Sequence, residues 1–437
     1  MSVSRRGLVA GSAALPFAPL PFSAMAQPAS GPPIRIGVMF DLSGPFAAAG
    51  SQACAAGAEI AFELFNERGG AGGRPVQAVA ADSQSRAEVA INEAERLISQ
   101  ERVDVVMGVF SSAHAMPLAQ RFEAQKKLLW ITTAISTAVI KGRNFTHVFR
   151  PTVHSDQYGE ASVQFLTEHS ERAFRIAPNN LRVAIIHEDG PYGTGVAASS
   201  EILAKAAGMR VVLHEGYSAT APDLSTLVTK LRRERPDVIL HTGYNPDITL
   251  FLRQAKAGGL RTRMIIGQGA GYSQIDRLTE TFGAEVNGFC NVDPAGTQML
   301  EPDKLTPAVR ELRQVMMQRY EAKTRARDLP THASTGFNSA WTFLEHVLKP
   351  AVREGDGSIQ AMIRATQSVD LPVGGTIQGH GLKFYPPGHE MAGQNERSST
   401  VVMQYEAARA KVVWPTAIAS GPPVLPFPAS SPFALRS

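Results

Sequence analysis

The sequence predicts an α/β protein made of two successive doubly wound units, Rossmann-like in each case. Three observations lead to this fold class. Short apolar runs of strand length alternate with longer stretches in which apolar residues recur every three or four positions, as in helices that cover a sheet. The alternation pauses near Arg150 and then starts afresh. At 437 residues, the chain also exceeds the usual size of one hydrophobic core, so we expect two domains.

The first unit opens with residues 34–40, IRIGVMF, which we expect to form a buried strand. A helix is predicted over about 47–67, because Ala56, Ile60 and Leu64 share one face. This alternation implies a parallel sheet with right-handed crossovers. The other elements are expected at 76–81 (strand), 85–100 (helix), 103–109 (strand), 113–125 (helix), 128–131 (strand) and 147–151 (strand).

The second unit repeats the pattern without detectable sequence repetition. Its expected helices cover about 156–169, 196–207, 223–233 and a segment ending near 257, and its strands cover 183–187, 211–216, 238–241, 264–267 and 286–292. Helical patterns follow at about 307–323, 334–352 and 358–366, with short strand candidates near 382–385, 401–405 and 412–414. The tail after Pro415 is rich in Pro, Ala and Ser, which predicts irregular structure.

The N-terminus reads as a targeting segment. Arg5-Arg6 precede a weakly apolar stretch that ends in Ala24-Met25-Ala26. This order is typical of a twin-arginine signal peptide over residues 1–26 with a small-x-small cleavage site. No later segment reaches membrane-spanning length, so we expect a soluble, exported protein.

Charge and cysteine content further limit the classes of protein to which this chain can belong. The formal net charge is +4, and no basic stripe with interleaved aromatic residues indicates nucleic-acid binding. Cys54 and Cys290 are the only cysteines. Two cysteines do not make a disulfide framework, and we expect two free, partly buried thiols.

The stretch 105–137 carries the main indication of a binding site. It reads as strand, turn, helix, strand and turn, with Ser111-Ser112 after the first strand and a Thr- and Ser-rich turn after the second. Ligands bind at the carboxyl ends of strands in open α/β sheets. The start of the helix adds unpaired N–H groups and a positive dipole end that suit a carboxylate. The alternative is ordinary helix capping by Ser112 and turn formation by Thr and Ser.

Neutral hydrogen-bonding and aromatic residues follow the other predicted strands. Tyr192 and Tyr244 each follow a strand of the second unit, where a tyrosine offers an apolar face and a hydroxyl for enclosing a small ligand. Loop packing is the alternative for each. Such a set suits reversible binding better than catalysis. The residues at these strand ends are Ser111, Ser112, Ser136, Tyr192, Tyr244, Asn245 and Gln268.

Motifs of common enzyme classes are missing from the sequence. SGPFAAAG follows the first strand and lacks the G-x-G-x-x-G pattern of dinucleotide sites, and neither a Walker A nor an H-E-x-x-H pattern occurs. Ser111 and Ser112 are not in a nucleophile-elbow motif. His187-Glu188-Asp189 is a polar turn, with metal binding as an alternative. We therefore expect no catalytic residue, metal or cofactor.

Five segments occur in order along the chain: LSGPFAAAG (42–50), GGAGGRPV (69–76), VVMGVFSSA (105–113), HEDGPYGTG (187–195) and HTGYNPD (241–247). Together they resemble the periplasmic solute-binding proteins of branched-chain amino-acid-type ABC transporters, the leucine/isoleucine/valine-binding type. The resemblance covers about 34–414.

The resemblance implies a type I periplasmic binding fold, in which two lobes joined by three crossovers close over the ligand by a hinge. We place the crossovers near 150–152, 292–295 and 374–378. Lobe 1 would then comprise 34–151 plus 295–376, and lobe 2 would comprise 152–294 plus 377–415. The irregular tail would be 416–437.

The resemblance also implies roles for individual residues. Ser112 matches the serine that holds the ligand carboxylate, and Ser136 matches a hydroxyl residue that helps to hold carboxylate and ammonium. Tyr192 and Tyr244 match two tyrosines of the second lobe. Ser111 and Ala134, beside the matched serines, complete the expected site.

Two positions depart from the family pattern. Ala49 stands where the family has an aromatic residue, which would leave room beside the ligand. Gln268 or Gly269 stands where the family has the acid that pairs the ammonium. An unpaired buried ammonium is costly, so a carboxylate without an amino group, an aromatic acid or an amide fits at least as well as an aliphatic amino acid.

Three functional hypotheses follow. The leading one is a monomeric receptor that delivers a small carboxylated or amide solute to an ABC permease in the inner membrane. The second is a sensory binding protein with the same fold. The third is an exported amidase-like enzyme that uses His187 or Glu188 near Tyr192.

Overall fold

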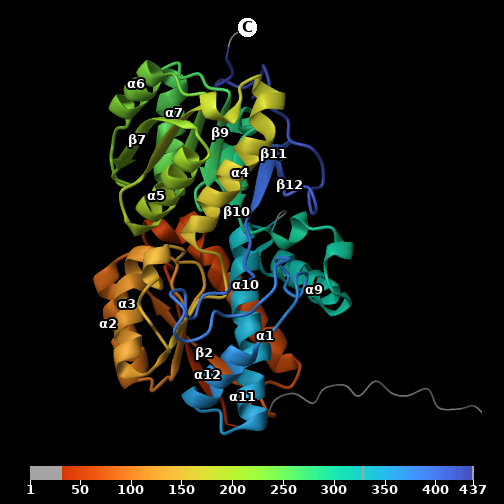
Figure 1. Ribbon diagram of the computed structural model, residues 1–437. Coiled ribbons are helices and arrows are strands. Elements are labelled where there is room, and N and C mark those ends of the chain that lie inside the picture. Colours follow the sequence, from red (N-terminus) through yellow and green to blue (C-terminus); the bar gives the residue numbers. More distant parts are fainter. Residues whose placement is uncertain (1–31, 327–328, 436–437) are drawn as a thin grey trace, which may run out of the picture.

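The computed structural model describes residues 32–326 and 329–435, so the predicted signal peptide lies outside the described residues. The chain forms two α/β lobes stacked one above the other (Figure 1). We call the part built on the five-stranded sheet lobe 1 and the part built on the seven-stranded sheet lobe 2. In each lobe, strands and helices alternate along the chain, as the apolar periodicity predicted.

Lobe 1 has a parallel sheet in the order β2-β1-β3-β4-β5. Its N-terminal elements are β1 (Ile34–Phe40), α1 (Gln52–Glu67), β2 (Val76–Asp82), α2 (Ala87–Ser99), β3 (Val105–Gly108), α3 (Ser112–Gln125), β4 (Leu128–Ile131) and β5 (Val148–Phe149). Leu97 of α2 and Leu118 of α3 share a buried cluster with Val106 of the sheet. Helices α2 and α3 therefore cover one face of this sheet.

Lobe 2 has the strand order β12-β11-β10-β9-β8-β6-β7, with β11 antiparallel to both of its neighbours. Its elements are α4 (Ser155–Phe174), β6 (Arg182–Glu188), α5 (Pro191–Ala206), β7 (Arg210–Tyr217), α6 (Ser225–Glu234), β8 (Val238–Thr242), α7 (Asn245–Ala257), β9 (Met264–Gln268), α8 (Ile275–Phe282), β10 (Cys290–Asp293), β11 (Val401–Glu406) and β12 (Arg409–Trp414). The inner strands are continuous apolar runs, as expected for a sheet buried on both faces.

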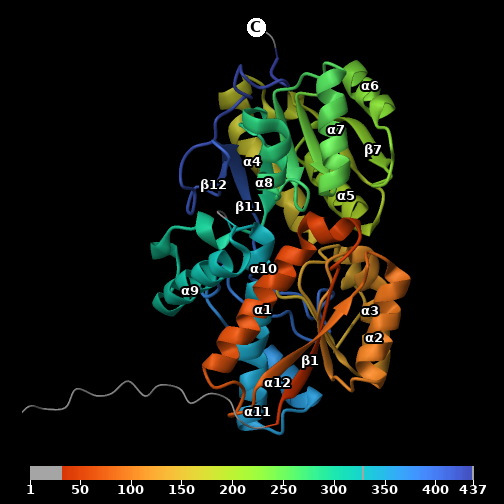
Figure 2. The ribbon, with the colours of Figure 1, turned by 180° about the vertical axis from the view of Figure 1, so that it is seen from behind.

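The remaining helices are α9 (Pro307–Thr324), α10 (Thr331–Phe343), α11 (Lys349–Glu354) and α12 (Ile359–Ser368). Helices α1 and α10 lie side by side in both views (Figures 1 and 2). Glycines permit this close approach, because a Cβ on Gly57 would lie 2.1 Å from the Ala333 carbonyl oxygen and one on Gly336 would lie 2.0 Å from that of Cys54. The contact fixes the N-terminal end of α10 next to lobe 2.

The third crossover lies later in the chain than the expected 374–378. Phe384 packs against Trp130 of the lobe 1 sheet, with 5.5 Å between ring centroids. Gln394 forms a β-bridge with Arg150, directly after β5. The segment around 382–394 is therefore part of lobe 1, and the chain crosses to lobe 2 only after it. Its apolar pattern predicts burial but does not specify which sheet it packs on.

Three elements differ locally from the sequence prediction. The helix expected over 47–67 begins with a π-helical turn, Ala47–Ser51, because Gly50 has a φ of 132°. The strand expected over 286–292 starts only at Cys290, after a 3₁₀ turn. The strand candidate near 382–385 forms isolated bridges instead of a ladder.

The tail and the cysteines are both packed on the core. Over 416–435 the chain forms turns, with no helix or strand in this described part. Phe427 and Phe433 of the tail pack against Phe289 of lobe 2, with ring centroids 5.3 and 5.7 Å away. Cys54 and Cys290 are free and fully buried, so the prediction of free thiols is confirmed.

A cavity between the lobes as the candidate binding site

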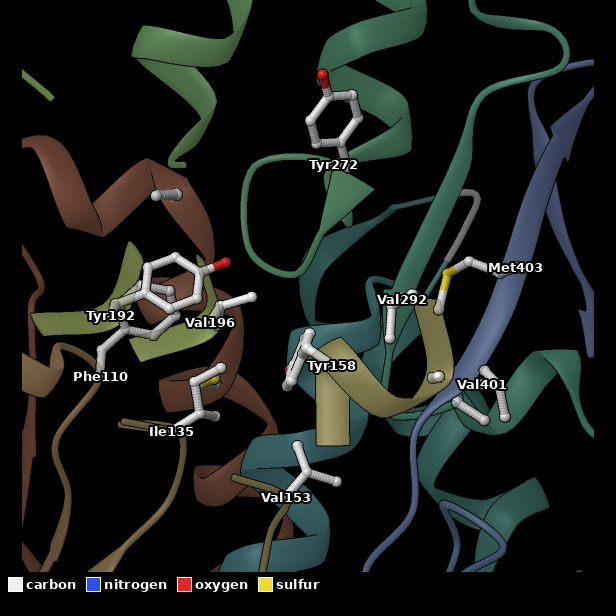
Figure 3. Packing of buried hydrophobic residues seen from close by; sticks show 14 of the residues in the cluster. Phe110, Ile135, Val153, Tyr158, Tyr192, Val196, Tyr272, Val292, Val401 and Met403 are labelled. Atoms are coloured by element: carbon white, nitrogen blue, oxygen red, sulfur yellow. The ribbon is translucent and has the colours of Figure 1, made fainter. Parts of the chain in front are cut away.

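A cavity lies where the two lobes meet, and residues of both lobes line it. Small-molecule sites occur preferentially at such interfaces between domains. In Figure 3, Phe110 and Ile135 of lobe 1 are grouped with Tyr158 and Tyr192 of lobe 2, and these residues line the cavity. The lining residues are Phe110, Ser112, Thr133, Ile135, Thr152, Tyr158, Tyr192, Tyr244, Ala270, Asp293, Pro294, His332 and Thr335.

The start of α3 forms one polar end of the cavity. Ser111 is the N-cap, and its hydroxyl oxygen accepts a hydrogen bond from the Ala113 N–H at 3.2 Å. Ser112, the first helical residue, lines the cavity, and its Oγ accepts from the Ser136 N–H at 3.1 Å. That bond leaves the Ser112 hydroxyl proton free for a ligand. The helix terminus adds the partial positive charge expected to favour an anion.

The backbone before α3 is strained, and this strain sets the direction of the turn that leads into the helix. Val109 has a φ of 62°, which is unusual for a β-branched residue. Gly108 has a φ of 114°, and a Cβ there would lie 2.0 Å from the Met39 carbonyl oxygen. Such strain persists only where the surrounding structure enforces it, and it clusters at ligand sites.

Ala134 and Ser136 lie behind the cavity wall, in the loop after β4. Their carbonyl oxygens accept hydrogen bonds from the Arg150 guanidinium, at 2.7 and 2.9 Å. The cavity-lining residues of this loop are instead Thr133 and Ile135. The two predicted residues therefore shape the loop, whereas their neighbours face the cavity.

Tyr192 and Tyr244 line the cavity from lobe 2, with ring centroids 5.4 Å apart. The Tyr192 hydroxyl donates to the Gln268 carbonyl oxygen at 2.5 Å and accepts from the Ala270 N–H at 3.1 Å. The Tyr244 side chain lies close to Ser111 of lobe 1. Burial raises the pKa of both tyrosines well above the ordinary value, so both hydroxyls stay protonated.

Asp293, at the end of β10, supplies a carboxylate that the sequence prediction missed. Its side chain lines the cavity and is buried. The Tyr158 hydroxyl donates to Oδ1 at 2.6 Å, and the Ser273 hydroxyl donates to Oδ2. Burial raises the pKa of Asp293 to about 6. The available signal was an acid directly after a predicted lobe 2 strand.

Gln268 does not face the cavity with its side chain. The Thr242 hydroxyl donates to Gln268 Oε1 at 2.9 Å, and Nε2 donates to Ser162 and Ser200 within the core of lobe 2. The expectation that the site lacks an acidic side chain is not met, because Asp293 lines the cavity. It rested on the side chain at this position, whereas the carboxylate comes from the neighbouring strand.

The end of α10 contributes two further residues that sequence reasoning missed, His332 and Thr335. Ala49 is buried outside the lining, and the space beside it holds the His332 ring. A Cβ on the adjacent Gly50 would lie 2.6 Å from His332 Nδ1. The room that we expected beside the ligand is thus partly filled by an imidazole.

The family model described as periplasmic binding protein matches residues 33–394. The chain belongs to this family. Leu/Ile/Val-binding protein homolog 7 from Brucella suis biovar 1 (strain 1330) is 32% identical over 395 residues, which cover 90% of this chain and 94% of the relative. The resemblance to solute-binding proteins of the branched-chain amino-acid type is confirmed.

Solved structures share the fold of this periplasmic binding protein. LivJ from Streptococcus pneumoniae, in complex with isoleucine, superimposes with a TM-score of 0.71 at 19% identity, over 87% of this chain and 99% of LivJ. A solute-binding protein from R. palustris in complex with benzoate gives 0.71 at 16%, over 90% of this chain and 98% of its own. The predicted two-lobed type I fold is confirmed.

The residues suggested for an amidase have other roles in this periplasmic binding protein. The Glu188 carboxylate accepts hydrogen bonds from the N–H groups of Gly190 and Gly193, at 2.7 and 2.5 Å, and so caps the start of α5. His187 lies outside the cavity lining. The family is one of binding proteins for transporters. Within 32–326 and 329–435, no three His, Cys, Asp or Glu side chains are grouped as metal ligands, and no helix is long and apolar enough to span a membrane.

Proposed function

We propose that this protein is the periplasmic substrate-binding component of an ABC importer and that its ligand is a small α-amino acid. The observation that carries the proposal is the lining of one cavity by both Ser112 and Asp293. The first sits at a helix N-terminus and the second is a buried carboxylate. A zwitterion presents the two complementary charges.

The carboxylate of the ligand binds at the start of α3. Ser112 has a free hydroxyl proton there, because its oxygen already accepts from the Ser136 N–H. The helix N-terminus contributes unpaired N–H groups and a favourable dipole. No lysine or arginine is among the residues that line the described cavity. A helix terminus therefore holds the anion in place of a side-chain cation.

The ammonium of the ligand binds at Asp293. Each carboxylate oxygen accepts one hydrogen bond, from Tyr158 or Ser273, and each oxygen has capacity for one more. An ammonium is a three-proton donor that meets this capacity and neutralises the buried charge. In the ligand-free protein the charge has no such partner, which agrees with a pKa raised to about 6.

An aromatic carboxylate without an amino group is the second candidate. The phenyl and phenol rings of Phe110, Tyr158, Tyr192 and Tyr244 favour a flat apolar body. A protonated Asp293 would then donate a hydrogen bond instead of pairing with an ammonium. Two solved relatives in fold support keeping both classes, since one is named as a complex with isoleucine and the other as a complex with benzoate.

When the lobes close around the ligand, a membrane partner recognises the closed, ligand-bound form. In this proposal the partner is the permease. Lobe 1 and lobe 2 both line the cavity, so the bound ligand stabilises their closed arrangement. A sensory receptor as the partner is the alternative with the same fold. We further propose export through the twin-arginine-type leader at residues 1–26 and a monomeric state in solution.

Calorimetric titration tests the ligand class. The mature protein is first unfolded and refolded to remove any bound ligand, and it is then titrated with amino acids and with aromatic acids that lack the amino group. Amino acids should bind and their deaminated analogues should not. Binding of the aromatic acids alone would select the second candidate. No binding by either class would contradict the proposed function, and loss of uptake of the bound solute in cells lacking the protein separates transport from sensing.

A further inference from the structure

His332 is held on several sides at the edge of the cavity. Its Nδ1 lies 3.0 Å from Gln274 Nε2 of lobe 2, and its ring centroid lies 5.4 Å from that of Phe110. Gly50 approaches the ring so closely that a Cβ there would lie within 3.0 Å of Nδ1, Cγ and Cε1. The imidazole therefore has one fixed orientation, and the Nε2 edge is the part without such a neighbour.

These contacts determine the tautomer. An amide nitrogen only donates, so the Gln274 contact makes Nδ1 the acceptor and places the proton on Nε2. Burial lowers the pKa of His332 to about 4, so the ring is neutral at physiological pH. Among the described residues, the hydrogen bond of the His332 ring is the one at Nδ1, and none is formed by the Nε2–H. His332 therefore offers one neutral donor to the cavity.

The neighbouring polar group is already used by the protein. Thr335 donates its hydroxyl proton to the Thr331 carbonyl oxygen at 3.2 Å and accepts from Gln378 Nε2 at 3.0 Å. Ser112 and Asp293 are assigned to the carboxylate and the ammonium of the ligand. The donor on His332 is thus left over for a third group, and that group belongs to the ligand side chain.

We propose that His332 is a specificity-determining residue that selects an α-amino acid whose side chain carries a neutral hydrogen-bond acceptor, a carboxamide or a hydroxyl. This inference rests on the proposed function. An apolar side chain of a bound ligand would cover the Nε2–H without offering it an acceptor, which is unfavourable. An anionic side chain would find no lysine or arginine in the described lining. Neutral polar amino acids are the class that remains.

Matched ligand pairs test the proposal without any mutation. Asparagine and leucine have the same side-chain branching, as do threonine and valine, and the members of each pair differ in polarity. Calorimetry on the wild-type protein should give at least about ten-fold tighter binding of the polar member in one or both pairs, the cost of a lost buried hydrogen bond. Tighter binding of leucine and valine would overturn the inference while leaving the proposed function intact.

Two variants then assign the preference to this residue. His332→Leu should weaken binding of the preferred polar ligand by about ten-fold and change binding of its apolar partner by less than about two-fold. His332→Gln keeps an N–H donor and should retain a polar preference. An unchanged polar-to-apolar ratio in His332→Leu would overturn the assignment. If His332→Leu does not fold, His332→Ala takes its place, because it also lacks the donor and should lose the polar preference. Failure of all amino acids to bind the wild-type protein would instead contradict the proposed function.

Discussion

The two walls of the cavity recognise a ligand by different physical means. Lobe 1 presents a helix N-terminus, the Ser112 hydroxyl and a neutral imidazole, and no ionised side chain of lobe 1 lines the described cavity. Lobe 2 presents the carboxylate of Asp293 with the rings of Tyr192 and Tyr244. Under the proposed function, a zwitterion would fit the two walls in one direction only. Both of its ends would be held only when the lobes are closed.

Contacts between the lobes exist around the site as well. Phe46 of lobe 1 packs on Tyr244 of lobe 2, with 4.5 Å between ring centroids, and Tyr244 also lies close to Ser111 of lobe 1. Gln274 of lobe 2 bonds His332 of lobe 1. The described arrangement is therefore a closed one, and binding free energy is spread over ligand contacts and contacts between the walls.

The largest expected effect comes from removing the charge on the second wall. Asp293→Asn preserves the shape and the hydrogen bond from Tyr158 but cannot pair with an ammonium. Amino-acid binding should weaken by about 2–5 kcal/mol, the cost of leaving a buried charge without its partner. Calorimetric titration measures the loss. An unchanged circular-dichroism spectrum is the control for folding of the variant, and an unchanged affinity for amino acids would exclude Asp293 as the ammonium site.

Removing the hydroxyl from the first wall should have a smaller effect. Ser112→Ala deletes the donor to the ligand carboxylate, but the helix N-terminus remains. Binding should weaken by about 1–3 kcal/mol. Ser136→Ala is the matched control, because its backbone N–H bonds Ser112 while its side chain is outside the lining. Equal losses in both variants would mean that the loop conformation, not the Ser112 hydroxyl, determines affinity.

The sequence was sufficient for the fold because strand and helix periodicities are local properties. The runs at 34–40 and 128–131 became strands of the expected sheet. Three predicted residues, Ser112, Tyr192 and Tyr244, line the cavity. Each of them follows a strand, where the topology fixes its position. Their roles in ligand binding stay predictions.

The site residues that the sequence did not reveal depend on contacts across the chain. His332 reaches the cavity only because Gly57 and Gly336 allow α1 and α10 to pack closely. Asp293 also follows a strand, but the family pattern places the acid at Gln268 or Gly269. Asp293 was therefore not predicted. Which of two adjacent strand ends turns its side chain inward depends on the twist and register of the sheet, which apolar periodicity does not encode.

The two walls should also differ in their response to pH. An ionised Asp293 is needed to pair with an ammonium, so affinity for an amino acid should fall by about ten-fold, or 1.4 kcal/mol, for each pH unit below about 6. The start of α3 has no group that titrates in this range among the described lining residues. Titrations between pH 5 and 8 measure the change, and Asp293→Asn should abolish it.

Stability of the ligand-free protein should change in the opposite direction. The pKa of Asp293 is raised from the ordinary 3.8 to about 6 in the folded protein. The stabilising contribution of the neutral acid is therefore fully present below about pH 3.8 and is lost as the pH rises through about 6. The difference in free energy of unfolding between wild type and Asp293→Asn isolates this contribution. A difference that grows in favour of the wild type with rising pH would contradict the burial argument.

The smallest expected effect distinguishes the part that Tyr244 plays in lobe closure from the part that Tyr192 plays in packing within lobe 2. The Tyr244 side chain lies close to Phe46 and Ser111 of lobe 1, whereas the Tyr192 hydroxyl bonds Gln268 and Ala270 inside lobe 2. Tyr244→Phe should weaken ligand binding by about 0.5–1.5 kcal/mol, mainly through faster dissociation, because it removes a polar contact made only in the closed state. Tyr192→Phe should lower the free energy of unfolding by a similar amount and change the dissociation rate less. Stopped-flow dissociation and chemical unfolding measure the two quantities. If both variants accelerate dissociation equally, the tyrosines act as one packed pair and the polar contact between the walls has no separate part in closure.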